Sequence, residues 1–169
     1  MKIGEAFYQR IAKPIGMEDF QPSDGFYFGG PLSIHPAYHF EITARDMARF
    51  GLLYLRHGRW NGKQIVPEAW VEKSSHASEM VQTDGVDRGG YEYLWWADSG
   101  GVHFPEVSLP GIYSARGNGA HFIFIIPTGT WSSCIARTTM LRSRMPKPLR
   151  KLRIEGCRST RSEHNSVIW

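Results

Sequence analysis

One short apolar run, His-Phe-Ile-Phe-Ile-Ile at residues 121–126, constrains the fold more than any other part of the sequence. Its β-branched and aromatic residues favour a strand, which Pro127 would end. Because both faces of this strand are apolar, it has to lie in a sheet that is covered by helices on at least one face. The run therefore predicts an α/β or α+β fold.

Two segments carry the apolar spacing of helices. In residues 3–13, Phe7 and Ile11 fall on one face, and Pro14 ends the pattern. A second helix is predicted to begin after the N-cap residue Thr43 and to end at Gly58. The apolar residues that recur along it at helical spacing are Met47, Phe50, Tyr54 and Leu55. A third, short helix is predicted to begin at Pro67.

Turn sequences between the remaining strands predict a largely antiparallel sheet. Asn61-Gly62 is typical of a tight hairpin, because these residues tolerate positive φ angles. Residues 91–96 and 111–114 are predicted to be strands that precede the apolar run at 121–126. Residues 15–41 are predicted to be a long ordered loop, and residues 74–90 a polar loop.

The net charge of +4 is unevenly distributed along the chain. Residues 1–127 hold 11 basic and 14 acidic residues, whereas residues 128–169 hold 9 basic and 2 acidic residues. The second segment also contains both cysteines and lacks Phe and Tyr. We therefore divide the chain into a domain at 1–127 and a basic tail at 128–169. Because the tail scatters Arg among Ser, Thr and Pro without aromatic residues for stacking, no nucleic-acid partner is predicted.

Several classes of site and segment are excluded. No apolar run reaches the roughly 18 to 20 residues that a membrane helix needs, and the first residues do not resemble a signal peptide. His35 and His39 have a ligand-like spacing, but Pro36 between them argues against a shared helical face, so no metal site is predicted. Phosphate loops and zinc-type cysteine clusters are also missing from the sequence, and no cofactor is predicted.

Several segments of the chain resemble the serine β-lactamase-like hydrolases, which include class C β-lactamases, penicillin-binding-protein-like carboxypeptidases and related esterases. The resemblance lies in Thr-Ala-Arg-Asp-Met-Ala-Arg-Phe-Gly from Thr43, Gly-Arg-Trp-Asn-Gly-Lys from Gly58, and Tyr-Ser-Ala-Arg-Gly-Asn-Gly from Tyr113. Matching segments occur in order over residues 1–127. The resemblance implies the C-terminal part of the β-lactamase/transpeptidase-like fold, with covering helices and a largely antiparallel sheet that is incomplete.

In that family, acyl transfer uses a serine nucleophile in a Ser-x-x-Lys motif and a further Tyr-x-Asn or Ser-x-Asn element. No serine in this chain has Lys three residues later, and no tyrosine or serine has Asn two residues later. We therefore expect a C-terminal fragment of a hydrolase for an ester, amide or β-lactam that is inactive alone, and no catalytic residue is assigned. The alternative is a non-catalytic binding module on the same scaffold.

The resemblance places a third active-site element within residues 112–119. Ser114 and Arg116 would face the substrate there, and Gly117 and Gly119 would shape the turn. The competing interpretation is that Arg116 is a surface charge at an ordinary hairpin. The expected partner is a small-molecule ester, amide or lactam, whereas the oligomeric state and the compartment are not specified by the sequence.

The tail departs from the family pattern, which continues with a final apolar strand and a C-terminal helix. A one-base shift of the reading frame after residue 128 would convert the Trp-Ser-Ser run from Trp131 into a Val-rich strand. We therefore expect residues 128–169 to be a frameshifted or disordered non-family tail. A divergent natural extension is the alternative.

Overall fold

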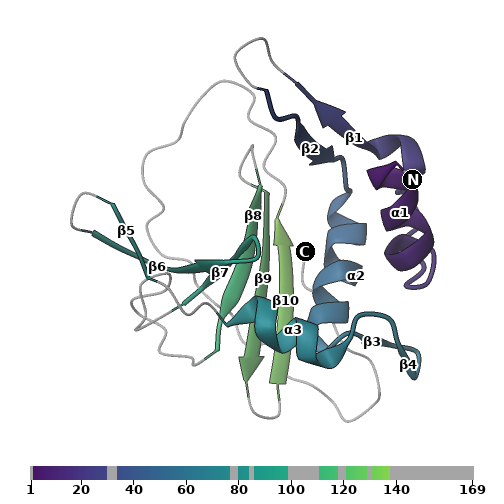
Figure 1. Cartoon of the computed structure of the whole chain (residues 1–169). Helices are drawn as coiled ribbons and strands as arrows, with labels where there is room; N and C mark the ends of the chain where they lie inside the picture. Colours follow the sequence, from purple (N-terminus) through teal and green to yellow (C-terminus); the bar gives the residue numbers. More distant parts are fainter. Residues whose placement is uncertain are drawn as a thin grey trace.

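The computed structural model describes residues 2–29, 34–76, 80–83, 86–98, 111–117, 121–128 and 131–137. Its largest element is a six-stranded antiparallel sheet in which each strand pairs with the next along the chain, in the order β10-β9-β8-β7-β6-β5 (Figure 1). The strands are β5 (Met80–Thr83), β6 (Val86–Glu92), β7 (Trp95–Ala97), β8 (Tyr113–Gly117), β9 (His121–Thr128) and β10 (Trp131–Arg137). The predicted α+β class with a largely antiparallel sheet is confirmed.

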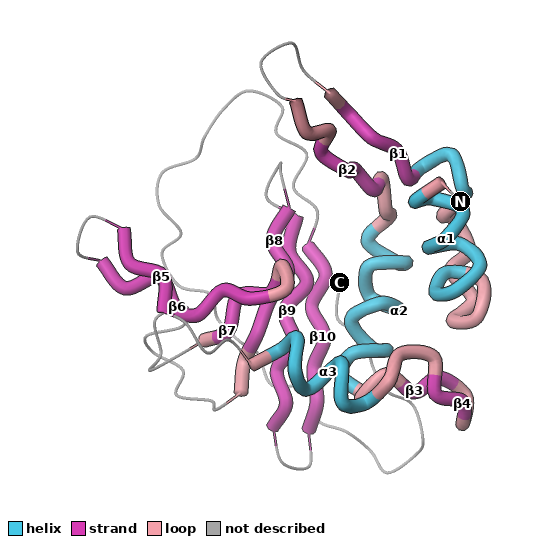
Figure 2. Tube along the Cα trace, in the orientation of Figure 1, coloured by secondary structure: helices cyan, strands magenta, loops and turns pink. Residues whose placement is uncertain are grey.

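Helices α1 and α2 lie together on one side of this sheet (Figure 2). Helix α1 (Ile3–Phe7) continues as a π-helix over Tyr8–Ala12, which confirms the helix predicted for residues 3–13. Helix α2 (Ala44–Leu55) begins after Thr43, whose Oγ1 accepts a hydrogen bond from the Asp46 backbone N–H at 3.4 Å. Helix α3 (Glu68–Ser75) follows Pro67. None of the helices in the described ranges has the length and apolar character needed to cross a lipid bilayer.

Helix α2 packs against β9 and β10. Successive side chains of β9 point to opposite faces of the sheet, so every second residue faces α2 and the core. Ile123 and Ile125 are buried in the hydrophobic core with Met47 and Leu53 of α2. Phe122 and Phe124 point to the opposite face, where their rings stack 5.5 Å apart and remain half-buried. The apolar run at 121–126 is therefore covered by a helix on one face, as the sequence predicts.

A cluster of aromatic rings joins α2 to the middle of the sheet. Trp95 of β7 is 5% exposed, and its ring lies 4.6 Å from Tyr54 and 5.2 Å from Tyr113. The ring of Phe50 is stacked nearly parallel to Trp95 at 6.4 Å. Such rings bury large apolar areas, so this cluster fixes how the helix lies on the sheet.

Two hairpins lie outside the large sheet. Strands β1 (Gly25–Phe28) and β2 (Ala37–Phe40) form one, and β3 (Arg59–Trp60) and β4 (Lys63–Gln64) form the other. The second hairpin confirms the predicted Asn-Gly turn, with φ angles of 47° at Asn61 and 77° at Gly62. The β1–β2 hairpin follows a 3₁₀ turn at Pro22–Asp24 and begins directly against α1.

Three local predictions are wrong. Residues 15–41 contain the β1–β2 hairpin rather than only loop, and residues 74–90 contain β5 and most of β6. The strand predicted for residues 91–96 is interrupted by a two-residue turn between β6 and β7. The segments that contain β1–β2 and β5–β6 are rich in glycine or polar residues, which favoured the prediction of loops. The turn at Tyr93-Leu94 contains none of the residues that signal a turn.

The sheet continues beyond the predicted boundary at residue 127. The backbone of β10 pairs antiparallel with β9, from Trp131 opposite Thr128 to Arg137 opposite Phe122. This strand occupies the place along the chain where the family resemblance puts a final strand. Residues 138–169 lie outside the described residues, and the assignment of 128–169 to a separate non-family tail stays a prediction.

Candidate functional site

An open cleft of about 790 Å³ lies between the β1–β2 hairpin, the segment that leads into α2, and the ends of β8 and β9. Its walls include Tyr38 of β2, Thr43 before α2, Leu94 of the β6–β7 turn, Arg116 of β8 and His121 of β9. A volume of this size is typical of a site for a small organic ligand. Segments that are distant in sequence therefore meet around one cavity.

Arg116 supplies a positive charge to the β-sheet wall of the cleft. Its guanidinium carbon lies 5.0 Å from the centre of the Trp96 ring, a cation–π arrangement, and its Nε donates a hydrogen bond to Ser114 Oγ at 3.2 Å. Partial burial lowers the pKa of the Arg116 guanidinium, and the negative charge of Asp98 opposes that shift. The group remains cationic at neutral pH and is held in one orientation.

Of the four residues that the sequence predicts at the substrate site, two are found on the wall of the cleft. Arg116 and Gly117 line the cleft. Ser114 is fully buried and lies on the face of β8 opposite Tyr113, so it acts on Arg116 rather than on the cavity. Gly117 is paired with His121 of β9, and Gly119 lies outside the described residues.

The opposite wall of the cleft comes from the β1–β2 hairpin, which carries Tyr38. Tyr38 and Tyr91 both line the cavity. Burial raises the pKa of Tyr38, and the neighbouring Tyr91 raises it further. Tyr38 is therefore a neutral phenol at physiological pH, able to donate or accept a hydrogen bond but poorly suited to act as a base.

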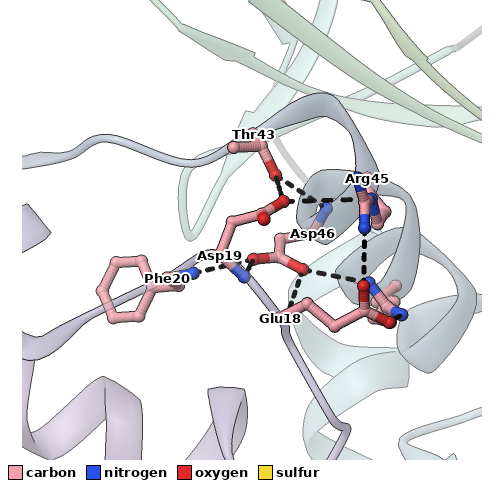
Figure 3. Close-up of polar contacts among 7 residues, drawn as sticks. Glu18, Asp19, Phe20, Thr43, Arg45 and Asp46 are labelled. Atoms are coloured by element: carbon pink, nitrogen blue, oxygen red, sulfur yellow. Dashed lines mark hydrogen bonds and ion pairs between the residues drawn. The ribbon is translucent and has the colours of Figure 1, made fainter.

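Asp46 of α2 fixes the base of this wall (Figure 3). Its carboxylate is fully buried and accepts hydrogen bonds from the backbone N–H groups of Glu18 at 3.0 Å, Asp19 at 3.0 Å and Phe20 at 2.9 Å. Arg49 Nη1 lies 3.2 Å from Asp46 Oδ1. Because Asp19 and Phe20 line the cleft, Asp46 holds in place a part of the wall that it does not itself form.

Glu18, Asp19 and α2 are joined by a second layer of contacts at the surface. Arg45 Nη1 pairs with Glu18 Oε2 at 2.6 Å, and Arg49 binds the other Glu18 oxygen. Thr43 Oγ1 donates to Asp19 Oδ2 at 2.7 Å. The hydrogen bond from Arg45, followed by the charge of Arg49, lowers the pKa of Glu18. The loop before β1 is therefore tied to α2 by both backbone and side-chain groups.

Sequence reasoning missed Tyr38, Tyr91 and Leu94 as cleft residues. Tyr38 was hidden because its strand was expected to be loop, and Leu94 because its turn was expected to be strand. Density of aromatic residues in residues 26–40 was the only signal that could have drawn attention to this wall. His39 lines the cleft and stacks on Phe26 at 5.7 Å. Within the described ranges, no three His, Cys, Asp or Glu residues gather as a group that could hold a metal ion.

Comparison with known proteins gives a similarity among solved structures. No protein-family model matches the chain, and no curated protein matches it. Among solved structures, it is similar to a "Putative 6-aminohexanoate-dimer hydrolase from Bacillus anthracis", with 29% sequence identity and a TM-score of 0.52. The match covers 75% of this chain and 30% of the Bacillus anthracis protein. The chain thus spans about 30% of that protein's length, and the mixed helical and antiparallel-sheet fold described above is that of part of a β-lactamase-like hydrolase.

Proposed function

We propose that this chain forms the C-terminal portion of a serine hydrolase that opens an ester, amide or β-lactam through an acyl-serine intermediate. The observation that carries the proposal is the position of Arg116 and Gly117, which end β8 on the wall of the cleft. The family resemblance expects a substrate-facing element at this strand. Similarity of fold to a solved hydrolase supports the same reaction class.

The contribution of this chain is to bind and orient the substrate. Arg116 presents a fixed guanidinium, which can donate hydrogen bonds to a carbonyl or carboxylate oxygen. Its Nε is engaged by Ser114, and the residue lines the cleft, so the Nη atoms are the donors proposed to meet the substrate. Tyr38 adds a neutral phenol on the opposite side.

The nucleophile and its activating lysine are proposed to come from a segment outside this sequence. No Ser-x-x-Lys or Tyr-x-Asn motif occurs among the 169 residues, and the acyl-transfer chemistry depends on such an activated hydroxyl. Ser114 is fully buried with its Oγ bound by Arg116, which makes it a poor nucleophile. This chain by itself is therefore expected to be catalytically inactive.

Assays with three substrate types test this proposal. Purified chain is expected to release no product above the buffer rate from nitrocefin, from p-nitrophenyl acetate, or from the 6-aminohexanoate dimer, the compound after which the similar hydrolase is named. Turnover by the chain alone would contradict its inactivity, and turnover that survives replacement of every serine would contradict the acyl-serine reaction. Reading the coding DNA upstream of Met1 adds a second test, since an in-frame Ser-x-x-Lys motif is expected there.

A non-catalytic binding module is the second candidate, and one observation favours it. Large side chains are exposed on the β1–β2 hairpin, with Phe26 39%, Tyr27 59% and Phe28 61% exposed. Exposed apolar patches commonly mark an interaction surface. A pull-down in which replacement of Tyr27 and Phe28 by Ser abolishes capture of a partner, together with no hydrolysis in any coding context, would favour this candidate over the hydrolase.

A further inference from the structure

The turn between β6 and β7 holds two residues in a backbone conformation that neither favours. Glu92 pairs with Trp95, so Tyr93 and Leu94 form a two-residue hairpin turn. Their φ angles are 47° and 71°, in the left-handed region. Glycine and asparagine normally occupy such positions, because a larger side chain crowds the backbone there. Strain of this kind persists only where the surrounding structure imposes it.

The position of Tyr93 is explained by packing on α3. Its ring makes an edge contact with Trp70 at 5.0 Å, and Lys73 Nζ lies 5.4 Å from the ring centre. Both partners belong to α3, which lies in front of the sheet in Figure 1. Tyr93 therefore anchors the turn to the helix, and this anchor offsets the cost of its conformation.

Leu94 has no such explanation. Its side chain is 58% exposed and does not belong to the hydrophobic core of the described residues. Glycine at this position would relieve the strain, which favours folding against the entropic cost that glycine carries. The side chain does, however, line the cleft together with Tyr91, which is 39% exposed. The role of the Leu94 side chain is therefore assigned to the cleft rather than to stability.

We propose that Leu94 and Tyr91 form an apolar lip that binds an alkyl chain of the substrate. The lip continues directly from the cationic part of the same wall: the Tyr91 ring lies 4.7 Å from Trp96, and Arg116 lies over the Trp96 ring. A wall with a cation next to apolar side chains complements a ligand whose polar, oxygen-bearing end is attached to an alkyl chain. This assignment rests on the proposed function, since it takes the cleft as the substrate site.

Binding of sodium butanoate, hexanoate and octanoate to the 169-residue chain tests the proposal by calorimetry or tryptophan fluorescence. Affinity of the native chain is expected to rise with chain length, by up to about fourfold for each fully buried methylene. Leu94→Gly is expected to lose about three- to tenfold in affinity for octanoate, while affinity for butanoate changes less than about twofold. The same variant is expected to have a higher Tm, because the strain is relieved.

His57→Gly is the matched control. His57 is exposed, has a φ angle of 52° and does not line the cleft, so its replacement relieves similar strain without removing a cavity contact. This variant should keep the chain-length dependence of the native chain. Leu94→Asn, which tolerates the same backbone conformation, should behave as Leu94→Gly does in binding.

Three results would overturn the proposal: no alkanoate binding by the native chain, affinity that does not depend on chain length, or an unchanged dependence in both Leu94 variants. A lower Tm for Leu94→Gly would overturn the argument from strain. These outcomes are separate from the hydrolysis assays, because alkanoate binding is measured without turnover. The proposed hydrolase function can therefore be contradicted while the apolar lip is confirmed. The lip can likewise be contradicted while the hydrolase function is supported.

Discussion

Asp46 is a buried carboxylate whose charge is balanced mainly by backbone N–H groups. The three N–H groups belong to consecutive residues of the loop before β1, and the Arg49 side chain donates a further hydrogen bond. These donors satisfy the hydrogen-bonding capacity of a carboxylate that is fully buried. Its position near the N-terminus of α2 adds a favourable interaction with the helix dipole.

Replacement of Asp46 by Ala is expected to reduce the free energy of unfolding by about 3–5 kcal/mol, because three backbone N–H groups, that of Phe20 buried and two part-buried, and Arg49 lose their acceptor. Urea unfolding followed by tryptophan fluorescence measures the change. Glu68→Gln is the control: its pair with Arg59 is long, at 3.9 Å, and both side chains are at least half exposed. A change in stability of similar size in both variants would contradict the role given to Asp46.

Glu18 predicts an acid-dependent part of the stability. Its pKa is lower in the folded chain than the ordinary value of about 4.3, so its pairing with Arg45 and Arg49 stabilises the fold fully above that value. This stabilisation is lost as the pH falls through the lowered pKa. Glu18→Gln should therefore show a smaller fall in Tm than the native chain between about pH 6 and about pH 3. Parallel curves for the two proteins would contradict the assignment.

Arg116 and Leu94 should affect alkanoate binding differently. Because Arg116 would contact only the carboxylate, Arg116→Gln is expected to weaken butanoate, hexanoate and octanoate equally, by at least about threefold. The increase of affinity with chain length should remain. Titration of the three alkanoates into this variant measures both quantities. A change in chain-length dependence without an equal loss for butanoate would contradict the position assigned to the guanidinium.

Among the elements, those specified by local signals were predicted well. The N-cap at Thr43, the apolar spacing of α2 and the Asn61-Gly62 turn each act within a few residues, and the structure has all three. Strand β1 has a Gly, Phe, Tyr, Phe sequence that alternates poorly, and it is defined by its pairing with β2 rather than by its own pattern. Such pairing depends on chain that is distant from the strand, and a local pattern does not report it.

A close approach of two glycines sets the angle between α1 and β1. A Cβ on Gly4 would lie 2.0 Å from the Pro22 carbonyl oxygen and 2.6 Å from that of Gly25. Gly4→Ala should therefore destabilise the chain by about 1–3 kcal/mol, because backbone atoms cannot move aside easily. Thermal unfolding measures the change. Gly29→Ala serves as control, since a Cβ there meets nothing within 4 Å, and equal effects of the two substitutions would contradict the packing argument.

At the scale of the molecule, residues singled out from the sequence lie on one wall of the cleft, whereas the other wall was not predicted from the sequence. The family resemblance pointed to the strand that carries Arg116 and Gly117, both of which line the cleft. The wall built from Tyr38 and the loop at Asp19 arises only when α2 and the β1–β2 hairpin pack near the ends of β8 and β9. That arrangement depends on buried contacts such as those of Asp46, which join residues more than 25 positions apart.

The tail boundary leads to a prediction about truncation. Removing residues after Thr128 deletes β10, exposes the edge of β9 and removes a strand that packs against α2. The variant truncated after Thr128 is expected to unfold at a lower urea concentration than a variant truncated after Arg137, or to aggregate. Equal unfolding curves for the two truncations would contradict a structural role for β10. Resequencing the coding DNA tests the separate prediction that the reading frame shifts near residue 128.

The neighbour-to-neighbour order of the large sheet has a consequence for the way the chain folds. Each strand from β5 to β10 can add to the one made just before it, so the sheet can grow by successive local steps as synthesis proceeds. Helix α2 is made long before its partners, since it ends at Leu55 and β10 begins at Trp131. The part of its apolar face that packs against β9 and β10 is therefore expected to stay uncovered until these strands are made, and exposed apolar surface makes such an intermediate prone to aggregation.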